Sequence, residues 1–136
     1  MIPNADITIF NKYTLNRVEK WTRRYIVRVV WQSTRAVNRA KPGVIAADSV
    51  FVMIPFARKD LAYLSPLVWQ ALTTKTGLWT LQEGDVIVRG LAVVDPATPS
   101  LITYLKQNFD EVVTISSIDA MDEGSPSMQH FELSCK

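Results

Sequence analysis

The histidine and the cysteine of this chain, His130 and Cys135, are the residues whose chemistry could support a nucleophilic enzyme, and each occurs once. A thiol becomes a strong nucleophile when a neighbouring imidazole accepts its proton within hydrogen-bonding distance. The two residues lie five positions apart in a segment that alternates polar and apolar side chains, so we expect them on opposite faces of one strand. The spacing predicts no catalytic pair, with His130 on the solvent face and Cys135 as a buried thiol.

Metal and phosphate sites also lack their usual sequence patterns. Asp119, Asp122 and Glu123 gather in one turn, but their spacing does not match a calcium-binding loop. The five glycines are isolated from one another, so neither a GxxxxGK nor a GxGxxG phosphate loop occurs. We therefore predict no catalytic residues, no cofactor, no metal and no small-molecule substrate, and we expect that the protein is not an enzyme.

The elements that would position any other site are mainly β-strands. Alternating or continuous apolar character predicts six strands, at residues 6–10, 21–32, 48–55, 86–89, 112–118 and 128–135. A capping residue followed by proline, at Ser65-Pro66 and Thr98-Pro99, predicts two short helices over residues 66–73 and 99–108. We expect a single domain over residues 1–136: a small β-barrel of about six strands with two short helices and long inter-strand loops.

The second predicted strand is the most basic part of this framework. Strict alternation over residues 21–32 places Trp21 and Tyr25 on one face and Arg24 and Arg28 on the other. The aromatic face is predicted to be core, which argues against base stacking, and the basic face is predicted to be exposed. The loop over residues 33–47 follows and carries three further basic residues, Arg35, Arg39 and Lys41. Together with Arg24 and Arg28, these are the predicted contacts with DNA phosphates.

Charge is distributed unequally along the chain. Residues 1–59 contain eleven Lys or Arg and three acids, a net +8, whereas residues 60–136 contain four and ten, a net −6. The two halves can balance each other inside one folded domain. Alternatively, surfaces of opposite charge suit head-to-tail contacts between identical subunits, because a heterologous interface joins two different patches of one molecule.

Two further expectations concern partners and membranes. Residues 61–81 hold Trp69, Leu78 and Trp79 amid apolar neighbours, which predicts either packing on the barrel or a protein interface. The longest apolar runs are far shorter than the roughly 20 residues that span a bilayer. The first six residues also lack the features of a signal peptide, so we expect a protein that is neither secreted nor in a membrane.

Several segments, taken in order, resemble the small head-tail connector proteins of tailed bacteriophages, in particular the head-closure or stopper group often described as minor capsid proteins. The matching segments are Asp6-Ile7-Thr8-Ile9, Val30-Trp31-Gln32, Phe51-Val52-Met53-Ile54-Pro55, Gly84-Asp85-Val86-Ile87-Val88-Arg89-Gly90, and the closing hairpin with Val113-Thr114-Ile115 and the return over residues 124–135. Residues 33–47, 56–83 and 95–108 lie outside the resemblance.

The resemblance implies a β-barrel that forms a homo-oligomeric ring in the virion, at the head-tail interface, after assembly in the host cytoplasm. Such a ring closes the DNA-filled head below the portal or adaptor and docks the tail, with non-specific contact to packaged double-stranded DNA. A long loop can block the channel; residues 33–47 and 56–83 are the two candidates, and the first is favoured for its basic residues. Neutralising Arg35, Arg39 and Lys41 is accordingly expected to give particles that leak DNA.

Two other functions stay open. A tail terminator, which caps the tail tube, is the neighbouring possibility within phage assembly, whereas adaptors are commonly helical. From a different class, the basic first half suits an OB-like module that binds single-stranded nucleic acid. Salt-sensitive binding of short oligonucleotides by a monomer would distinguish this module from an assembly protein.

Overall fold

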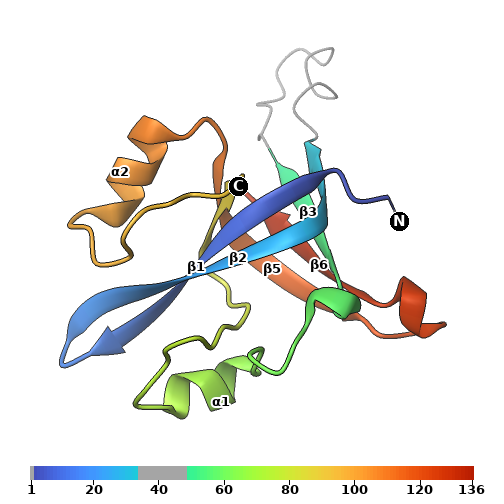
Figure 1. Ribbon diagram of the computed structural model, residues 1–136, viewed down its shortest axis with the longest axis horizontal. Helices are drawn as coiled ribbons and strands as arrows, with labels where there is room; N and C mark the ends of the chain where they lie inside the picture. The colour runs from blue at the N-terminus through green and yellow to red at the C-terminus, as the bar shows by residue number, and fades with distance from the viewer. Residues whose placement is uncertain (1, 34–48) are drawn as a thin grey trace, which may run out of the picture.

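The chain folds into a closed antiparallel β-barrel, as the sequence predicts (Figure 1). The computed structural model describes residues 2–33 and 49–136. Within these ranges the strands are β1 (Ala5–Leu15), β2 (Val18–Ser33), β3 (Val50–Pro55), β4 (Val86–Arg89), β5 (Val112–Met121) and β6 (His130–Cys135). Their order around the barrel is β1-β2-β3-β6-β5-β4, and β4 pairs with β1 to close it.

The barrel interior is filled by apolar side chains from alternate strand positions. Ile7 and Ile9 of β1 are completely buried, and Leu133 and Cys135 of β6 belong to the same cluster. In β6 the buried positions alternate with half-buried ones along the whole strand, which is the period-2 pattern expected from the sequence. Removal of this apolar surface from water is the main favourable contribution to folding.

The first two strands are longer than the sequence pattern predicts. The strand predicted over residues 6–10 continues to Leu15, and the strand predicted to begin at residue 21 begins at Val18. Strand β4 pairs with β1 only over residues 7–10, so residues 12–15 pair with β2 alone. The β1–β2 hairpin therefore projects from the barrel, toward the lower left of Figure 1.

A β-bulge in β2 changes which of its residues face the core. Val27 and Arg28 together oppose Asp6 of β1, where the pairing shifts by one residue. Arg28 adopts a positive φ of 58°, and its backbone N–H donates to Asp6 Oδ1 at 3.0 Å. The extra residue reverses the alternation, so Tyr25 is 37% exposed while Trp31 is 4% exposed. The prediction that Tyr25 shares the inner face with Trp31 is wrong.

Residues 56–83 pack against the barrel rather than projecting from it. They include the short 3₁₀ turn η2 (Phe56–Arg58) and helix α1 (Pro66–Ala71), which confirms the predicted first helix and ends it two residues early. Trp79 lies completely buried in the core cluster of the barrel, and its indole N–H donates to Asp60 Oδ1 at 3.2 Å. This segment therefore packs as part of the domain.

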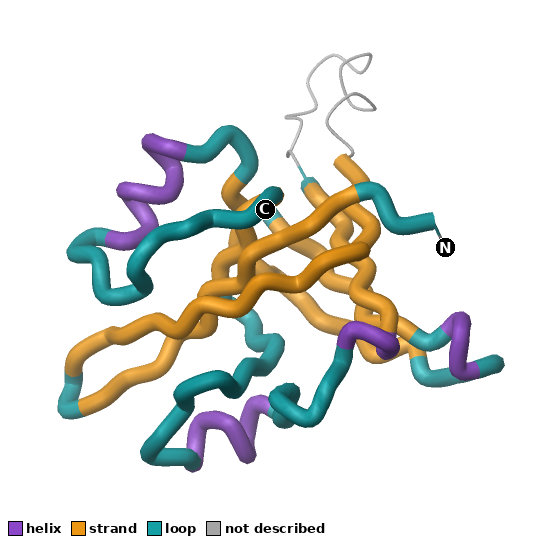
Figure 2. Tube along the Cα trace, in the orientation of Figure 1, coloured by secondary structure: helices purple, strands orange, loops and turns teal. Residues whose placement is uncertain are grey.

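A second apolar cluster lies outside the barrel, over β1 and β4. Helix α2 (Leu101–Asn108) covers the outer face there, with the preceding loop beside it (Figure 2). Leu105 packs in this cluster with Phe10, and both are completely buried. Trp21 of β2 is half-buried at the margin of the same cluster. Trp21 thus packs on the outside of the barrel, whereas the sequence predicted it inside.

Candidate functional site

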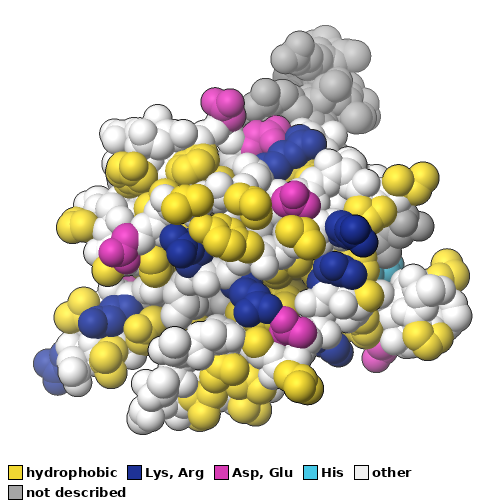
Figure 3. Space-filling model, viewed as in Figure 1, with side chains coloured by type: hydrophobic (Ala, Val, Ile, Leu, Met, Phe, Trp, Pro, Cys, Tyr) yellow, Lys and Arg dark blue, Asp and Glu magenta, His cyan; other side chains and the backbone are white. Residues whose placement is uncertain are grey.

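The tip of the β1–β2 hairpin forms a basic projection. Asn16 and Arg17 both have positive φ, 52° and 64°, which makes the tight two-residue turn that suits the twist of a hairpin. Lys12, Arg17 and Lys20 are exposed and form no ion pair within residues 2–33 and 49–136. Residues 12–20 carry three basic residues and one acid, a net +2. Figure 3 shows their positive charge at the lower left end of the molecule.

The β5–β6 hairpin forms an acidic end at the other extreme of the long axis, to the right in Figure 1. It contains the 3₁₀ turn η3 (Pro126–Met128). Residues 112–135 carry four acids and no Lys or Arg, a net −4 with His130 neutral: Asp119, Asp122, Glu123 and Glu132. Asp119, Asp122 and Glu123 are exposed. The charge split along the sequence therefore becomes, in part, a split between two hairpins at opposite ends of the barrel.

Each charged end also exposes apolar side chains. Leu15 and Val18 face each other across the basic hairpin and are 47% and 55% exposed. Near the acidic hairpin, an apolar groove of about 540 Å³ lies on the outer side of β2, β3 and β6. Its lining is Ile2, Asn4, Val30, Gln32, Met53, Ser127, Met128 and His130. Exposed apolar surface beside charge is typical of protein interfaces.

The predicted DNA contacts are dispersed. Arg24 forms an ion pair with Asp60. Burial raises the pKa of Asp60, but the hydrogen bond from the Trp79 indole, the charge of Arg24 and a backbone N–H together lower it by more. The pKa of Asp60 therefore lies below its usual value. Arg28 is exposed at the β-bulge. Arg35, Arg39 and Lys41 lie outside the described residues. Arg24 is half-buried and paired with Asp60 whereas Arg28 is exposed at the bulge, so the two do not form the single exposed basic face that the sequence predicts.

For the segment 61–81, burial favours packing over a protein interface, the two alternatives that the sequence left open. Trp69 and Trp79 are 0% exposed, and Leu78 is half-buried. Trp69 packs edge-on against Tyr13 of the β1–β2 hairpin, with ring centroids 5.9 Å apart. These large side chains are packed within their own chain, which leaves the two tryptophans no surface for a partner. The exposed apolar residues of the segment are Leu61, Leu67 and Val68, the last two on α1 at the bottom of Figure 3.

Trp21, Arg23 and Tyr25 form an outward stripe on β2 that strict alternation did not anticipate. The guanidinium of Arg23 lies 5.1 Å from the ring centroid of Tyr25 and donates to the carbonyl of Val94 at 2.6 Å. The Tyr25 hydroxyl donates to the carbonyl of Ala92 at 3.2 Å. These bonds hold the loop before α2 against β2, so the stripe is partly occupied by the chain's own backbone.

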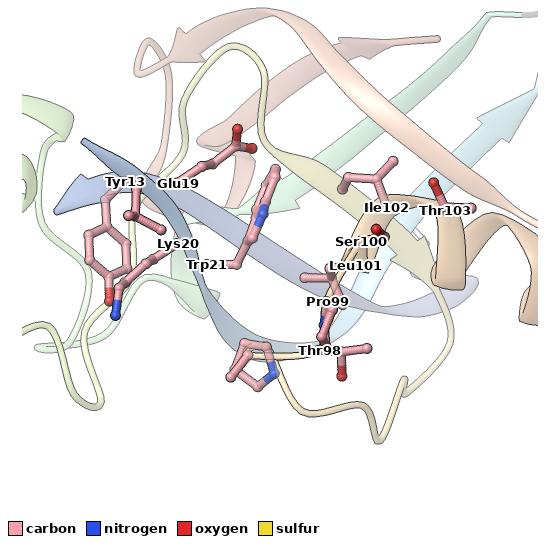
Figure 4. Close-up of a pocket in the computed structure, with 13 residues that line it drawn as sticks. Tyr13, Glu19, Lys20, Trp21, Thr98, Pro99, Ser100, Leu101, Ile102 and Thr103 are labelled. Carbon is pink, nitrogen blue, oxygen red and sulfur yellow. The ribbon is translucent and has the colours of Figure 1, made fainter. Parts of the chain in front are cut away.

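A groove of about 650 Å³ lies between the β1–β2 hairpin and the start of α2 (Figure 4). Trp21, Glu19 and Lys20 line one side, and Thr98 and Ser100 line the other. Its hydroxyl groups have no histidine or cysteine beside them, since neither residue type lines the groove. A hydroxyl needs an adjacent base to act as a nucleophile. The groove therefore holds hydroxyl groups, one carboxylate and one ammonium group, without the imidazole that most often activates a hydroxyl.

Three titratable groups, Cys135, His130 and Asp85, are shielded by burial or bonded within their own chain. Burial raises the pKa of the Cys135 thiol to about 12, which leaves it protonated and unreactive at neutral pH. His130 lies on the opposite face of β6, where its Nδ1 is 2.9 Å from the Met128 carbonyl. Asp85 is 1% exposed and bonded to donors of its own chain. Within residues 2–33 and 49–136, no three His, Cys, Asp or Glu residues are grouped to hold a metal ion.

Sequence reasoning missed both apolar surfaces at the charged ends. The signal for the hairpin tip was visible: Leu15 and Val18 flank a polar two-residue turn, where exposed positions are usually hydrophilic. The groove had no such signal, because Met53 and Met128 come from strands and turns far apart in the sequence. None of the described helices is long and apolar enough to span a bilayer.

The fold and its surfaces define a small closed β-barrel protein with oppositely charged ends. The model of a family of unknown function, DUF6751, matches residues 2–136, and the chain belongs to this family. No curated protein and no solved structure matches the chain.

Proposed function

We propose that this protein is a structural subunit of the neck of a tailed bacteriophage. In this role it forms a homo-oligomeric ring, closes the DNA-filled head below the portal or adaptor, and docks the tail. The resemblance of its strand segments to head-closure proteins suggests this location in the virion. The observation that carries the proposal is the opposition of a basic and an acidic hairpin at the two ends of one barrel. Repeated subunits with such ends attract one another head to tail.

The closed barrel suits a component that must hold its shape under load. Its strands are paired around the whole circumference, and residues 56–83 and α2 add two packed layers on its surface. The grooves of the described residues can serve as contact surfaces for neighbouring subunits. Basic side chains such as Arg28 and Arg17 can contact the phosphates of packaged DNA without reading its sequence.

Quantitative mass spectrometry of density-purified phage particles tests this role. Particles from a strain that carries the gene are expected to contain the protein at a fixed ratio to the portal protein, about one or one half per portal subunit. Particles from which the gene product has been depleted are expected to package DNA and then lose it. Absence of the protein from intact, infectious particles would contradict the proposal.

A second candidate function is a module that binds single-stranded nucleic acid. The observation that favours it is the outward stripe of Trp21, Arg23 and Tyr25, since strands of this kind can present aromatic rings to bases and cations to phosphates. Binding of short oligonucleotides by a monomer, lost in high salt and weakened at least tenfold in Trp21→Ala, would support this function. The matched control is Tyr104→Ala, which removes an exposed aromatic ring from α2.

A further inference from the structure

We infer that two specific surfaces join neighbouring subunits: the β1–β2 tip of one copy docks into the groove beside the β5–β6 hairpin of the next. The occupant of the groove is thus a second copy of this chain. The inference rests on the ring-forming part of the proposed function and names the contact that makes the ring.

The apolar parts of the two surfaces are complementary in kind. The tip offers Leu15 and Val18, side by side on a projecting turn. The groove offers Val30, Met53 and Met128, with Met128 67% exposed. Methionine has three rotatable bonds and a polarizable sulfur, so it adapts its shape to an inserted apolar side chain. Within the described residues, no other part of the chain covers the convex apolar tip or fills the concave apolar groove.

The charges around the two apolar parts have opposite signs. The tip carries Lys12, Arg17 and Lys20 with Glu19, a net +2 over residues 12–20. The hairpin beside the groove carries a net −4 over residues 112–135. Oε2 of Glu132 lies 3.6 Å from Nε2 of the groove residue His130. Charge complementarity of this kind steers association and sets the direction in which the two surfaces meet.

The location of the surfaces determines the symmetry of the assembly. The tip and the acidic hairpin lie at opposite ends of the long axis, so one molecule can use both at once with two different neighbours (Figure 1). A contact between two different patches is heterologous, and it gives a ring when the rotation per subunit closes. A two-fold dimer would instead have to make both tip–groove contacts between the same two copies.

Disulfide cross-linking of the full-length protein tests the contact. Val18→Cys and Met128→Cys are made in separate chains, distinguished by a tag, and mixed under mild oxidation. The expected result is a disulfide between the two variants. The control mixes Val18→Cys with Lys106→Cys, because Lys106 is exposed on α2 and lies outside the proposed contact. The disulfide yield should exceed that of the control at least tenfold. The native thiol of Cys135 does not interfere, because it is buried. A yield equal to that of the control would overturn the inference.

Charge reversal tests the same contact without cysteines. Arg17→Glu with Lys20→Glu, and separately Asp122→Lys with Glu123→Lys, should each abolish self-association in analytical ultracentrifugation at high protein concentration. Mixing the two variants should restore association beyond pairs, because the acidic tip of the first fits the basic hairpin of the second, and the basic tip of the second fits the acidic hairpin of the first. Oligomers that persist in both variants, or a native chain that never self-associates, would overturn this contact. Mass spectrometry of the particles tests the proposed function separately from this contact. If the protein is present in virions but does not cross-link, the role in the neck is retained and the contact is rejected. If the protein is absent from virions, the role in the neck is rejected whatever the cross-linking result.

Discussion

The side-chain amide of Asn11 donates to Oδ2 of Asp85 at 2.7 Å, in a site where neither residue is more than 1% exposed. The same amide nitrogen also donates to the Thr80 carbonyl at 2.7 Å, and Asp85 Oδ1 accepts the backbone N–H of Lys12 at 2.9 Å. This network links the base of the projecting hairpin to the residues that begin β4. A buried polar group without such partners would be strongly destabilising.

Asp85 should make stability depend on pH in a direction opposite to that of most carboxylates. Burial raises its pKa from 3.8 to about 6, against the opposing effect of its N–H donors from Lys12, Asn11 and Gln82. Because the folded pKa is the higher one, its contribution is complete below 3.8 and is lost as the pH rises through about 6. The loss is on the order of 3 kcal/mol. Urea unfolding from pH 4 to pH 7 measures it.

Asp85→Asn should remove this pH dependence, whatever its effect on absolute stability. The substitution places a second amide donor opposite Asn11, so some loss at every pH is expected. The control is Asp110→Asn, at an exposed position, which should keep the native slope. An unchanged slope in Asp85→Asn would show that another group titrates.

Trp79→Ala should destabilise the fold by about 3–5 kcal/mol, because it empties a large buried site in the core of the barrel. It also deprives Asp60 of the indole donor at 3.2 Å. Leu61→Ala, at a fully exposed position of the same segment, should change the free energy of unfolding by no more than about 0.5 kcal/mol. Chemical denaturation followed by circular dichroism compares the two variants. Equal effects would contradict the packing of residues 56–83 on the barrel.

Arg28→Gly should be at least as stable as the native protein. The φ of 58° at this bulge position costs an L-residue roughly 1–2 kcal/mol, which glycine avoids. Arg28→Val should lose about 1–2 kcal/mol, since a branched side chain tolerates this backbone least. Lys20→Val, at an exposed β2 position with ordinary φ, is the control for the change of side chain. Thermal unfolding measures all three variants, and equal stability of Arg28→Val and Arg28→Gly would refute the bulge.

Cys135 should not react with a thiol reagent in the native protein at neutral pH. Its pKa is raised to about 12 by burial, and the thiolate is the reactive form. One thiol per chain should become reactive when the protein is unfolded in guanidinium chloride. Lys106→Cys, at an exposed position of α2, serves as the positive control in the folded state. Rapid labelling of native Cys135 would mean that β6 opens readily.

The sequence predicted the strands well because their burial follows a local period. Val86–Arg89 and the buried positions of His130–Cys135 appear as expected, since each inward residue meets a continuous core. The faces of β2 were not predictable, because the bulge at Arg28 depends on the pairing with Asp6 in another strand. Alternation carried through a bulge assigns every residue beyond it to the opposite face.

The surfaces were harder to predict than the fold. The sequence left open whether Trp69 and Trp79 pack on the barrel or form an interface, and the fold buries them against Tyr13 and Tyr63. The charge asymmetry was visible along the chain, but its division between two opposite hairpins depends on the topology of the barrel. Tertiary structure thus determines which apolar and charged residues remain available to a partner.

The place of β6 between β3 and β5 has a consequence for how the protein is made. Val50 pairs with Cys135 on one side, and Ile115 pairs with the same residue on the other. Translation delivers these six residues after the other strands, so the barrel stays open until they emerge from the ribosome. During that interval β3 and β5 expose unpaired backbone edges, which are prone to wrong strand pairing. The nascent barrel is therefore most vulnerable to aggregation just before β6 becomes available, and chaperone assistance would matter most at that stage.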